Sequence, residues 1–185
     1  MTKLILISGK GEAGKTLTAN IIKEKLENKG KRVTLLPFAA YLKFICKEHF
    51  GWNGNKDLEG RRILQYVGTD VVRKRNPNFW VKTVADFIET FGEDFDFIIS
   101  DDVRFVNELE YFRDVLVTEN LSVRIERLNH ENLLTEEQRK HPSETALDDY
   151  PFDIYIYSES GLKNLEEALH QQFLDNVGVK EWLGL

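Results

Sequence analysis

The chain has 185 residues, of which 42% are hydrophobic, and its formal net charge is −6 at pH 7. This length and apolar content suffice for one substantial buried core and predict a single domain. The acidic balance argues against a protein that coats a nucleic acid polymer or an anionic membrane, because such partners select for a basic face.

The single cysteine, Cys46, excludes an intrachain disulfide and predicts a reducing, cytoplasmic setting. Cys46 lies in a helical apolar stripe, which favours a buried packing role over a nucleophilic one. No apolar run approaches the roughly 20 residues of a membrane span, so we expect no membrane partner. The sequence leaves open whether the chain is a monomer or a homodimer.

The chain begins with the pattern of a phosphate-binding loop. Residues 4–8 form a short apolar run, typical of a strand buried in a parallel sheet, and a helical pattern follows. Between them, G-K-G-E-A-G-K-T fits the pattern G-x-x-x-x-G-K-[ST]. Its residues are Gly9, Lys10, Gly11, Glu12, Ala13, Gly14, Lys15 and Thr16. We expect backbone N–H groups of this loop to hold phosphates, Lys15 to reach the outer phosphates and the Thr16 hydroxyl to bind Mg²⁺.

Strand and helix patterns then alternate along the chain. Strands are expected at 33–36, 95–100, 122–126 and 154–157, and helices at 42–50, 63–72, 80–91, 109–116 and 162–173. This alternation predicts an α/β fold with a parallel sheet covered on both faces. Two regions depart from the rhythm: about 39–91 holds three helices between consecutive strands, and about 128–151 is polar. Insertions of this size are often binding arms or lids.

An acidic pair follows a predicted strand in F-D-F-I-I-S-D-D-V-R-F. A phosphate-binding loop needs a carboxylate at the end of a nearby strand to hold its metal ion, so we expect Asp101 or Asp102 beside Thr16. The alternative is that either aspartate only caps the helix that follows.

Five cations are expected near the carboxyl ends of the strands, where open α/β sheets bind ligands. They are Lys43, Arg73, Arg104, Arg127 and Arg139. Each could instead be a surface charge, and Arg104 could pair with Glu108 one turn later.

The ordered set GKGEAGKT, PFAAYLK, LQYVGTDVVR, NPNFW, SDDVRFVNE, HPSETALDD and YSESGLKNLEEAL resembles the phage and bacterial deoxynucleoside monophosphate kinases. These are similar to the adenylate-kinase type of nucleoside monophosphate kinase. The resemblance implies a three-layer P-loop NTPase fold with a five-stranded parallel sheet. It divides the chain into a core (1–38, 92–127 and 152–185), a helical arm that binds the nucleoside monophosphate (about 39–91) and a short lid (about 128–151).

The same resemblance implies roles for the site residues. ATP is the phosphoryl donor on the loop, with Arg127 against its adenine. Phe38, Lys43, Arg73, Trp80 and Arg104 are implied to bind the acceptor monophosphate. Lys15, Arg73, Arg104, Asp102 and the lid residue Arg139 are implied to act in phosphoryl transfer, and the metal is assigned to Thr16 with Asp102 preferred over Asp101.

Two departures from the family pattern leave alternatives open, and one of them is S-D-D-V-R-F, which has two acids where the family usually places its Asp directly before V-R-F. Where the family often has F-A-D-P-L-K, this chain has F-A-A-Y-L-K at 38–43, so base and sugar preference is not fixed. Other readings are a P-loop kinase of another small molecule, of the dephospho-coenzyme A or phosphomevalonate type, and a nucleotide-dependent switch without kinase activity. A hydroxyl acceptor would need a general base, which Asp101 or Asp102 could supply.

Overall fold

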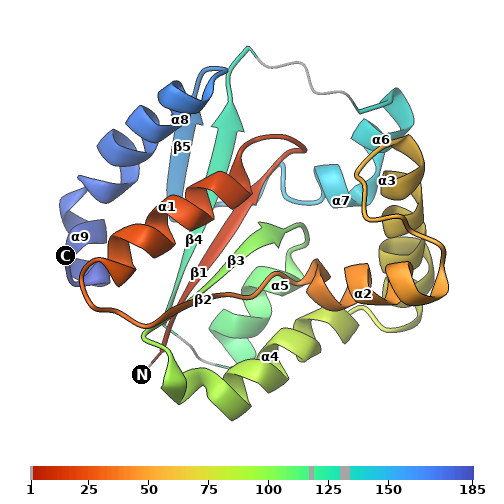
Figure 1. Cartoon of the computed structure of the whole chain (residues 1–185), viewed down its shortest axis with the longest axis horizontal. Coiled ribbons are helices and arrows are strands. Elements are labelled where there is room, and N and C mark those ends of the chain that lie inside the picture. The colour runs from red at the N-terminus through yellow and green to blue at the C-terminus, as the bar shows by residue number, and fades with distance from the viewer. Residues whose placement is uncertain (1, 117–118, 130–133) are drawn as a thin grey trace.

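A five-stranded parallel sheet forms the centre of the protein (Figure 1). The computed structural model describes residues 2–116, 119–129 and 134–185. The strand order is β2-β3-β1-β4-β5, and each neighbouring pair is parallel. The strands are β1 (Lys3–Gly9), β2 (Val33–Leu35), β3 (Phe97–Val103), β4 (Glu119–Arg127) and β5 (Ile154–Ser158). This arrangement confirms the predicted α/β fold class, because parallel strands need helical crossovers that cover the faces of the sheet.

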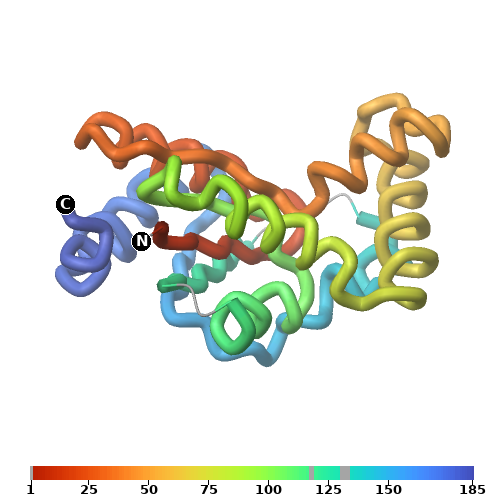
Figure 2. Tube along the Cα trace, turned by 90° about the horizontal axis from the view of Figure 1, so that it is seen from below, coloured from red at the N-terminus to blue at the C-terminus, as the bar shows by residue number. Residues whose placement is uncertain are grey.

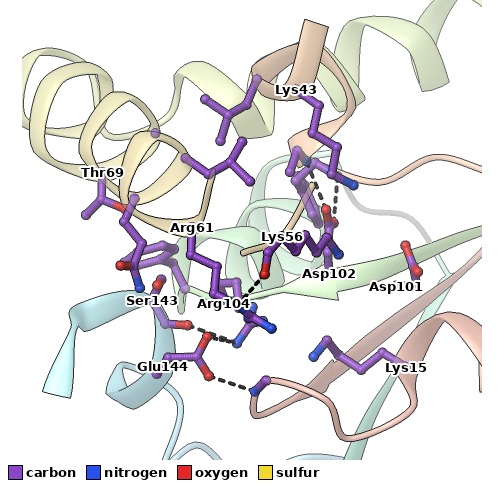
Figure 3. A pocket seen from close by; sticks show the side chains of 18 of the residues that line it. Lys15, Lys43, Lys56, Arg61, Thr69, Asp101, Asp102, Arg104, Ser143 and Glu144 are labelled. Atoms are coloured by element: carbon purple, nitrogen blue, oxygen red, sulfur yellow. Dashed lines mark hydrogen bonds and ion pairs between the residues drawn. The ribbon is translucent and has the colours of Figure 1, made fainter. Parts of the chain in front are cut away.

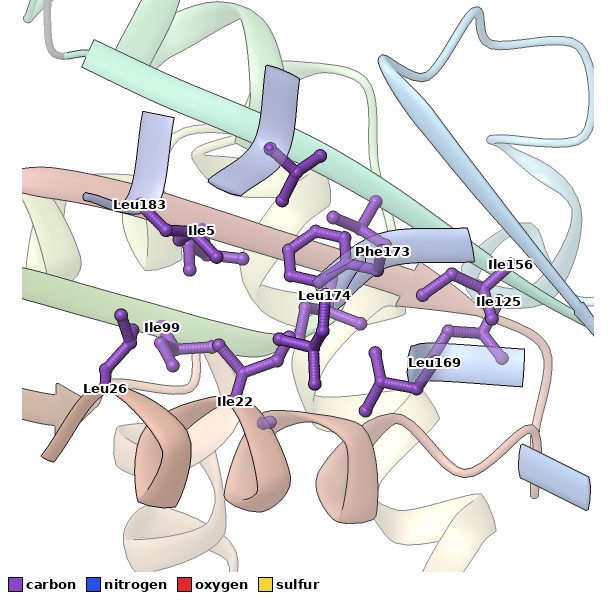
Figure 4. Packing of buried hydrophobic residues seen from close by; sticks show 14 of the residues in the cluster. Ile5, Ile22, Leu26, Ile99, Ile125, Ile156, Leu169, Phe173, Leu174 and Leu183 are labelled. Atoms are coloured by element: carbon purple, nitrogen blue, oxygen red, sulfur yellow. The ribbon is translucent and has the colours of Figure 1, made fainter. Parts of the chain in front are cut away.

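The first face of the sheet is covered by α1 (Lys15–Glu27), by α8 (Leu162–Leu169) with its π-helical continuation η4 (His170–Leu174), and by α9 (Val177–Leu183). Ile22 and Leu26 of α1 and Phe173 of η4 meet Ile5 and Ile99 of the sheet in one buried cluster (Figure 4). The apolar residues at 19, 22 and 26 give α1 the stripe that binds it to the sheet. This packing fixes the start of α1 directly after the phosphate-binding loop.

The opposite face is covered by α4 (Phe79–Phe91), the short η2 (Gly92–Asp94), α5 (Asn107–Glu110) and η3 (Tyr111–Val115). Val81 and Ile88 of α4 share a buried cluster with Leu4, Leu6 and Ile98 of the sheet. Neighbouring residues of a strand point to opposite faces, so Ile98 and Ile99 belong to the two different clusters.

A helical arm stands beyond the carboxyl ends of the strands (Figure 2). It contains α2 (Ala39–His49), α3 (Leu58–Gln65) and the π-helical η1 (Tyr66–Arg73). Leu42, Cys46, Trp52, Val67 and Trp80 form its own apolar cluster, in which Cys46 is fully buried. The predicted packing role of Cys46 is therefore confirmed.

Several boundaries differ from the sequence-based expectation. Strand β3 continues past Ser100 through both aspartates to Val103, and α9 was not expected. The polar stretch 128–151 contains two short helices, α6 (Glu136–Lys140) and α7 (Pro142–Thr145), while its residues 130–133 lie outside the described residues. Within the described ranges, no helix is both long and apolar enough to cross a membrane.

Candidate active site

A cavity of about 440 Å³ lies at the carboxyl ends of the strands, between the loop 9–16, the arm and α7. Its wall includes six Lys or Arg residues, in a chain whose formal charge is −6. These six are Lys15, Lys43, Lys56, Arg61, Arg73 and Arg104. Cations gathered in a concave site focus a positive potential that attracts anionic ligands.

The loop 9–16 has the backbone that phosphate binding requires. Gly14 has a left-handed φ of 94° and immediately precedes α1, and a Cβ there would lie 2.3 Å from a Leu165 side-chain carbon. A Cβ at Gly9 would lie 2.8 Å from the Ile125 carbonyl oxygen, so the loop can approach β4 only with glycine at this position. Lys15, the first residue of α1, is buried and lies where the positive end of that helix faces the cavity.

The Lys15 ammonium is held by its own loop. Its Nζ donates to the carbonyl oxygens of Gly9 (2.8 Å) and Lys10 (2.7 Å). Burial lowers the pKa of Lys15 well below its usual value, and the nearby Arg104 guanidinium lowers it further. An anion in the cavity would counteract both effects, because an opposite charge favours the protonated amine.

Asp101 and Asp102 point in different directions because they are neighbours on β3. Asp101 lies on the α1 side, where its Oδ2 accepts a 2.6 Å hydrogen bond from Thr16 Oγ1. Asp102 lies toward α2, where it accepts from the backbone N–H groups of Phe38 (2.8 Å) and Ala39 (3.0 Å). The aspartate beside Thr16 is therefore Asp101, and not Asp102 as the sequence analysis preferred. Burial and the Asp101 charge raise the pKa of Asp102.

Arg73 ends η1 and reaches into the cavity, where it forms an ion pair with the buried Glu108. Its guanidinium also lies over the Phe105 ring, 4.0 Å from the centroid. The other oxygen of Glu108, Oε2, accepts from the backbone N–H groups of Arg104 (2.6 Å) and Phe105 (3.1 Å). Burial raises the pKa of Glu108, and Arg73 opposes that shift.

The Arg104 side chain does not pair with Glu108, the alternative that the sequence left open. It forms a 2.8 Å ion pair with Glu144 of α7 instead. Lys15 and Arg104 point toward one another in the cavity (Figure 3).

The other residues expected to bind the acceptor also line the cavity. Phe38 is buried under the first turn of α2, and Lys43 lies one turn further along, directed toward Asp102 (Figure 3). Trp80 is buried in the arm cluster, and its indole Nε1 donates to the Gly68 carbonyl at 3.0 Å. Trp80 thus forms a rigid wall of the cavity.

Besides Gly9, three residues expected in the site lie outside the cavity wall. Lys10 pairs with Asp148 and donates to the Glu144 carbonyl at 2.8 Å. Arg127, at the end of β4, lies beside Gly14, and its buried Nε has no hydrogen-bond partner among the described residues. Arg139 on α6 is exposed and donates to the Leu134 carbonyl at 3.0 Å.

Sequence reasoning missed three residues of the site. Lys56 lines the cavity, and its pKa is lowered by burial and by Lys43. Arg61 of α3 pairs with Glu12 of the loop at 2.9 Å, which joins the arm to the phosphate-binding loop. Glu144 pairs with Arg104. The available signal for Glu144 was the motif HPSETALDD, while Lys56 and Arg61 lie in a polar segment that carries no comparable pattern.

Comparison with known proteins gives two matches. A family model described as deoxynucleotide monophosphate kinase matches residues 36–169. A protein of Escherichia phage RB69, named deoxynucleotide monophosphate kinase, is 33% identical over 121 residues, which is 64% of this chain. The match spans 46% of the phage protein's length. The family model covers the arm, β3, β4 and β5, whereas the phosphate-binding loop precedes the matched residues.

Proposed function

We propose that this chain, which belongs to the deoxynucleotide monophosphate kinase family, transfers the γ-phosphoryl group of ATP to a (deoxy)nucleoside 5′-monophosphate. The observation that carries the proposal is one cavity lined by Lys15 of the phosphate-binding loop, Arg73 and Arg104, in which Lys15 and Arg104 point toward one another. A phosphoryl transfer between two anionic substrates needs cations on both the donor and the acceptor side. The product is the nucleoside diphosphate.

The donor side is assigned to the loop 9–16. Its backbone N–H groups and Lys15 would hold the ATP phosphates, and Arg127 beside Gly14 offers a guanidinium face to the adenine. The hydroxyl of Thr16 and the carboxylate of Asp101, 2.6 Å apart, would supply oxygen ligands of the kind that Mg²⁺ prefers. The ion would neutralise phosphate charge when bound. This assignment places the metal role on Asp101, with Asp102 as the residue that anchors α2.

The acceptor side is assigned to the arm and the segment after β3. Arg73 and Arg104 present planar guanidinium groups suited to two phosphate oxygens each, and Lys43 adds a third positive charge. Phe38 and Trp80 would support the nucleoside from the apolar wall. Glu108 holds Arg73 in place, so less side-chain entropy is lost when an anion binds.

The partners of the carboxylates favour a phosphate acceptor over a hydroxyl acceptor. Thr16 donates to Asp101, two backbone N–H groups donate to Asp102, and Arg73 pairs with Glu108. Because each of these three carboxylates is already engaged by a donor of the protein, none is positioned as a general base. A nucleoside monophosphate needs none, because its phosphate oxygens are largely ionised near neutral pH, with a second pKa of about 6.

We infer that the mobile arm and the lid are each shorter than the segments expected from the sequence, about 39–91 and about 128–151. Helix α4 shares the core cluster of the sheet, so the arm consists of α2, α3 and η1. The lid role falls on α6, which carries Arg139. A cytoplasmic setting is proposed from the single, buried Cys46. The choice between a monomer and a homodimer is left to measurements of the protein's mass in solution.

An acceptor panel tests the proposal. Purified protein is incubated with Mg-ATP and each common ribo- and deoxynucleoside monophosphate, and diphosphate products are counted. Dephospho-coenzyme A and phosphomevalonate serve as acceptors for the rival kinase classes. We expect turnover with one or more nucleoside monophosphates only. Turnover with a rival acceptor, and none with any nucleotide, would refute the proposal.

A further inference from the structure

The motif HPSETALDD carries a buried glutamate, Glu144, that lines the cavity. The segment folds as α7, with His141 as N-cap and Pro142 in the first turn. Glu144 lies in this short helix and is only 8% exposed. A buried carboxylate is costly unless cations or N–H groups surround it, so its partners explain its place in the fold.

The carboxylate of Glu144 joins the two sides of the cavity (Figure 3). Its Oε2 accepts from the backbone N–H of Gly11 at 2.8 Å, on the donor side. Its Oε1 pairs with Arg104 Nη1 at 2.8 Å, on the acceptor side. The same Nη1 donates to the Ser143 carbonyl at 3.2 Å. The guanidinium is thus fixed by two acceptors of α7, and α7 is fixed to the loop.

Helix α7 is itself anchored to rigid parts of the fold. The Glu144 carbonyl accepts from Lys10 Nζ at 2.8 Å, and Lys10 also pairs with Asp148. Asp148 in turn contacts the buried Arg124 of β4 at 3.4 Å. These contacts tie both ends of the segment to the sheet and the loop, so Glu144 has little freedom to move away from Arg104.

The charge of Glu144 also offsets the repulsion between Lys15 and Arg104. Lys15 and Arg104 repel each other, and this repulsion contributes to the lowered pKa of Lys15, whereas Glu144 acts in the opposite direction. Without the carboxylate, the arginine would be pushed away from the amine in a site of low dielectric constant. The negative charge of Glu144 beside Arg104 offsets this repulsion and allows both cations to face the same space.

We propose that Glu144 is a positioning residue for phosphoryl transfer, whose carboxylate fixes the Arg104 guanidinium against the phosphate-binding loop and directs it toward the group in transfer. The inference rests on the proposed function. It predicts that loss of the carboxylate misplaces Arg104 and lowers kcat more than it weakens acceptor binding, because Arg73 and Lys43 still hold the acceptor.

The test compares Glu144→Gln with Glu136→Gln, which removes the same charge from an exposed site on α6. We expect Glu144→Gln to lower kcat roughly 10- to 100-fold. The fall in kcat should exceed any rise in the acceptor KM, since Arg73 and Lys43 still bind the acceptor, and the ATP KM should stay within about twofold of wild type. The control should match wild type. If Glu144→Gln melts well below the control, Glu144→Asp, which keeps the charge but withdraws it from Arg104, is expected to show the same fall in kcat.

A rescue experiment separates positioning from a structural role. In Arg104→Ala, added guanidinium ion should restore part of kcat, because Glu144 can still bind the free ion where the Arg104 guanidinium lay. In Arg104→Ala with Glu144→Gln, the same guanidinium concentration should restore nothing. Unchanged kcat in Glu144→Gln, tighter ATP binding with unchanged kcat, or equal rescue in both backgrounds would overturn the inference.

A second readout needs no activity and so separates this inference from the proposed function. The Arg104 guanidinium resonances, assigned by their loss in Arg104→Lys, should show slow rotation and slow proton exchange in wild type and in Glu136→Gln. Both rates should rise in Glu144→Gln. Equal rates in all three proteins would contradict the positioning role even if the wild type phosphorylates nucleotides. Absence of nucleotide phosphorylation in the wild type would refute the proposed function alone.

Discussion

The Thr16 hydroxyl donates a 2.6 Å hydrogen bond to Asp101 Oδ2, which joins the first turn of α1 to β3, the strand paired with β1. We predict that Asp101→Asn lowers phosphoryl transfer roughly 10- to 100-fold, as loss of a residue that orients a metal site does. The Mg²⁺ concentration for half-maximal activity should rise. Initial rates over a magnesium titration measure both effects.

Asp102→Asn is the matched control for this prediction. Asp102 accepts two backbone N–H groups at the start of α2, a capping contact whose loss costs about 1 kcal/mol. We expect a small drop in melting temperature and an unchanged magnesium dependence. A larger shift in magnesium dependence for Asp102→Asn than for Asp101→Asn would return the metal role to Asp102.

Removal of the loop amine should abolish transfer while the fold remains. Lys15 donates only to carbonyl oxygens of its own loop, and burial lowers its pKa. Lys15→Met keeps the apolar stem and removes the charge, so we expect kcat to fall roughly 100-fold or more. Circular dichroism and thermal melting should match wild type. Lys163→Met, which removes an exposed lysine of α8 from a surface pair with Glu167, should be far less damaging. Equal turnover in Lys15→Met and wild type would refute the donor site.

The buried pair of Arg73 and Glu108 predicts a pH-dependent defect. Arg73→Met leaves the Glu108 carboxylate buried without its cation, which costs about 3–5 kcal/mol when the carboxylate is charged. The pKa of Glu108, already raised by burial, should rise further because Arg73 no longer lowers it. A raised folded-state pKa means that stability is fully present below the unfolded pKa and is lost as pH rises through the folded one. The stability deficit of Arg73→Met should therefore grow from acid toward neutral pH.

Urea unfolding across this pH range measures the deficit. Lys74→Met is the control, because Lys74 pairs with Asp70 on the surface and such pairs contribute about 0–1 kcal/mol. Arg73→Lys separates the functional role, since it keeps the charge but loses the planar fork. We expect it to raise the acceptor KM or lower turnover, with ATP binding unchanged. A deficit of Arg73→Met that is constant with pH would contradict the buried-pair account.

Helices α6 and α7 should respond differently to substrates. Arg139 on α6 is exposed and outside the cavity wall, so its lid role requires α6 to move, whereas α7 is already anchored through Glu144 and Asp148. Amide exchange with and without a bisubstrate analogue measures this. We expect protection to increase in α6 and to change little in α7. Equal protection of α6 in both conditions would count against Arg139 as a lid residue.

The sequence predicted the sheet and the glycine loop between β1 and α1 well, because both depend on local patterns. The apolar run at 4–8, the glycines that allow the loop to approach β4, and the stripe 19, 22, 26 each act over a few residues. The orientation of Asp101 and Asp102 was not predictable, because it depends on which face of β3 the helix α1 covers. Ile99 belongs to the α1 cluster, and Asp101 shares its face two residues later.

The contacts between distant segments could not be predicted from the sequence either. Arg104 and Glu144 are 40 residues apart, and Arg61 and Glu12 are 49 apart. Such pairs form only once the arm and α7 are folded against the sheet edge. The buried partner of Arg73 is Glu108, which the sequence offered as a neighbour of Arg104 one turn away. The pair of Arg104 and Glu108, which the sequence left open because the two residues are close in the chain, is replaced in the structure by the pair of Arg73 and Glu108.

The most direct test of the central claim is the stoichiometry of one reaction, followed by ³¹P NMR. Wild-type protein receives Mg-ATP and the deoxynucleoside monophosphate that gives the highest turnover, and all phosphorus resonances are integrated with time. We predict one ADP and one deoxynucleoside diphosphate for each ATP consumed, with no inorganic phosphate beyond the enzyme-free control. ADP that accumulates with inorganic phosphate, while the monophosphate remains unchanged, would contradict a kinase and indicate hydrolysis at this site.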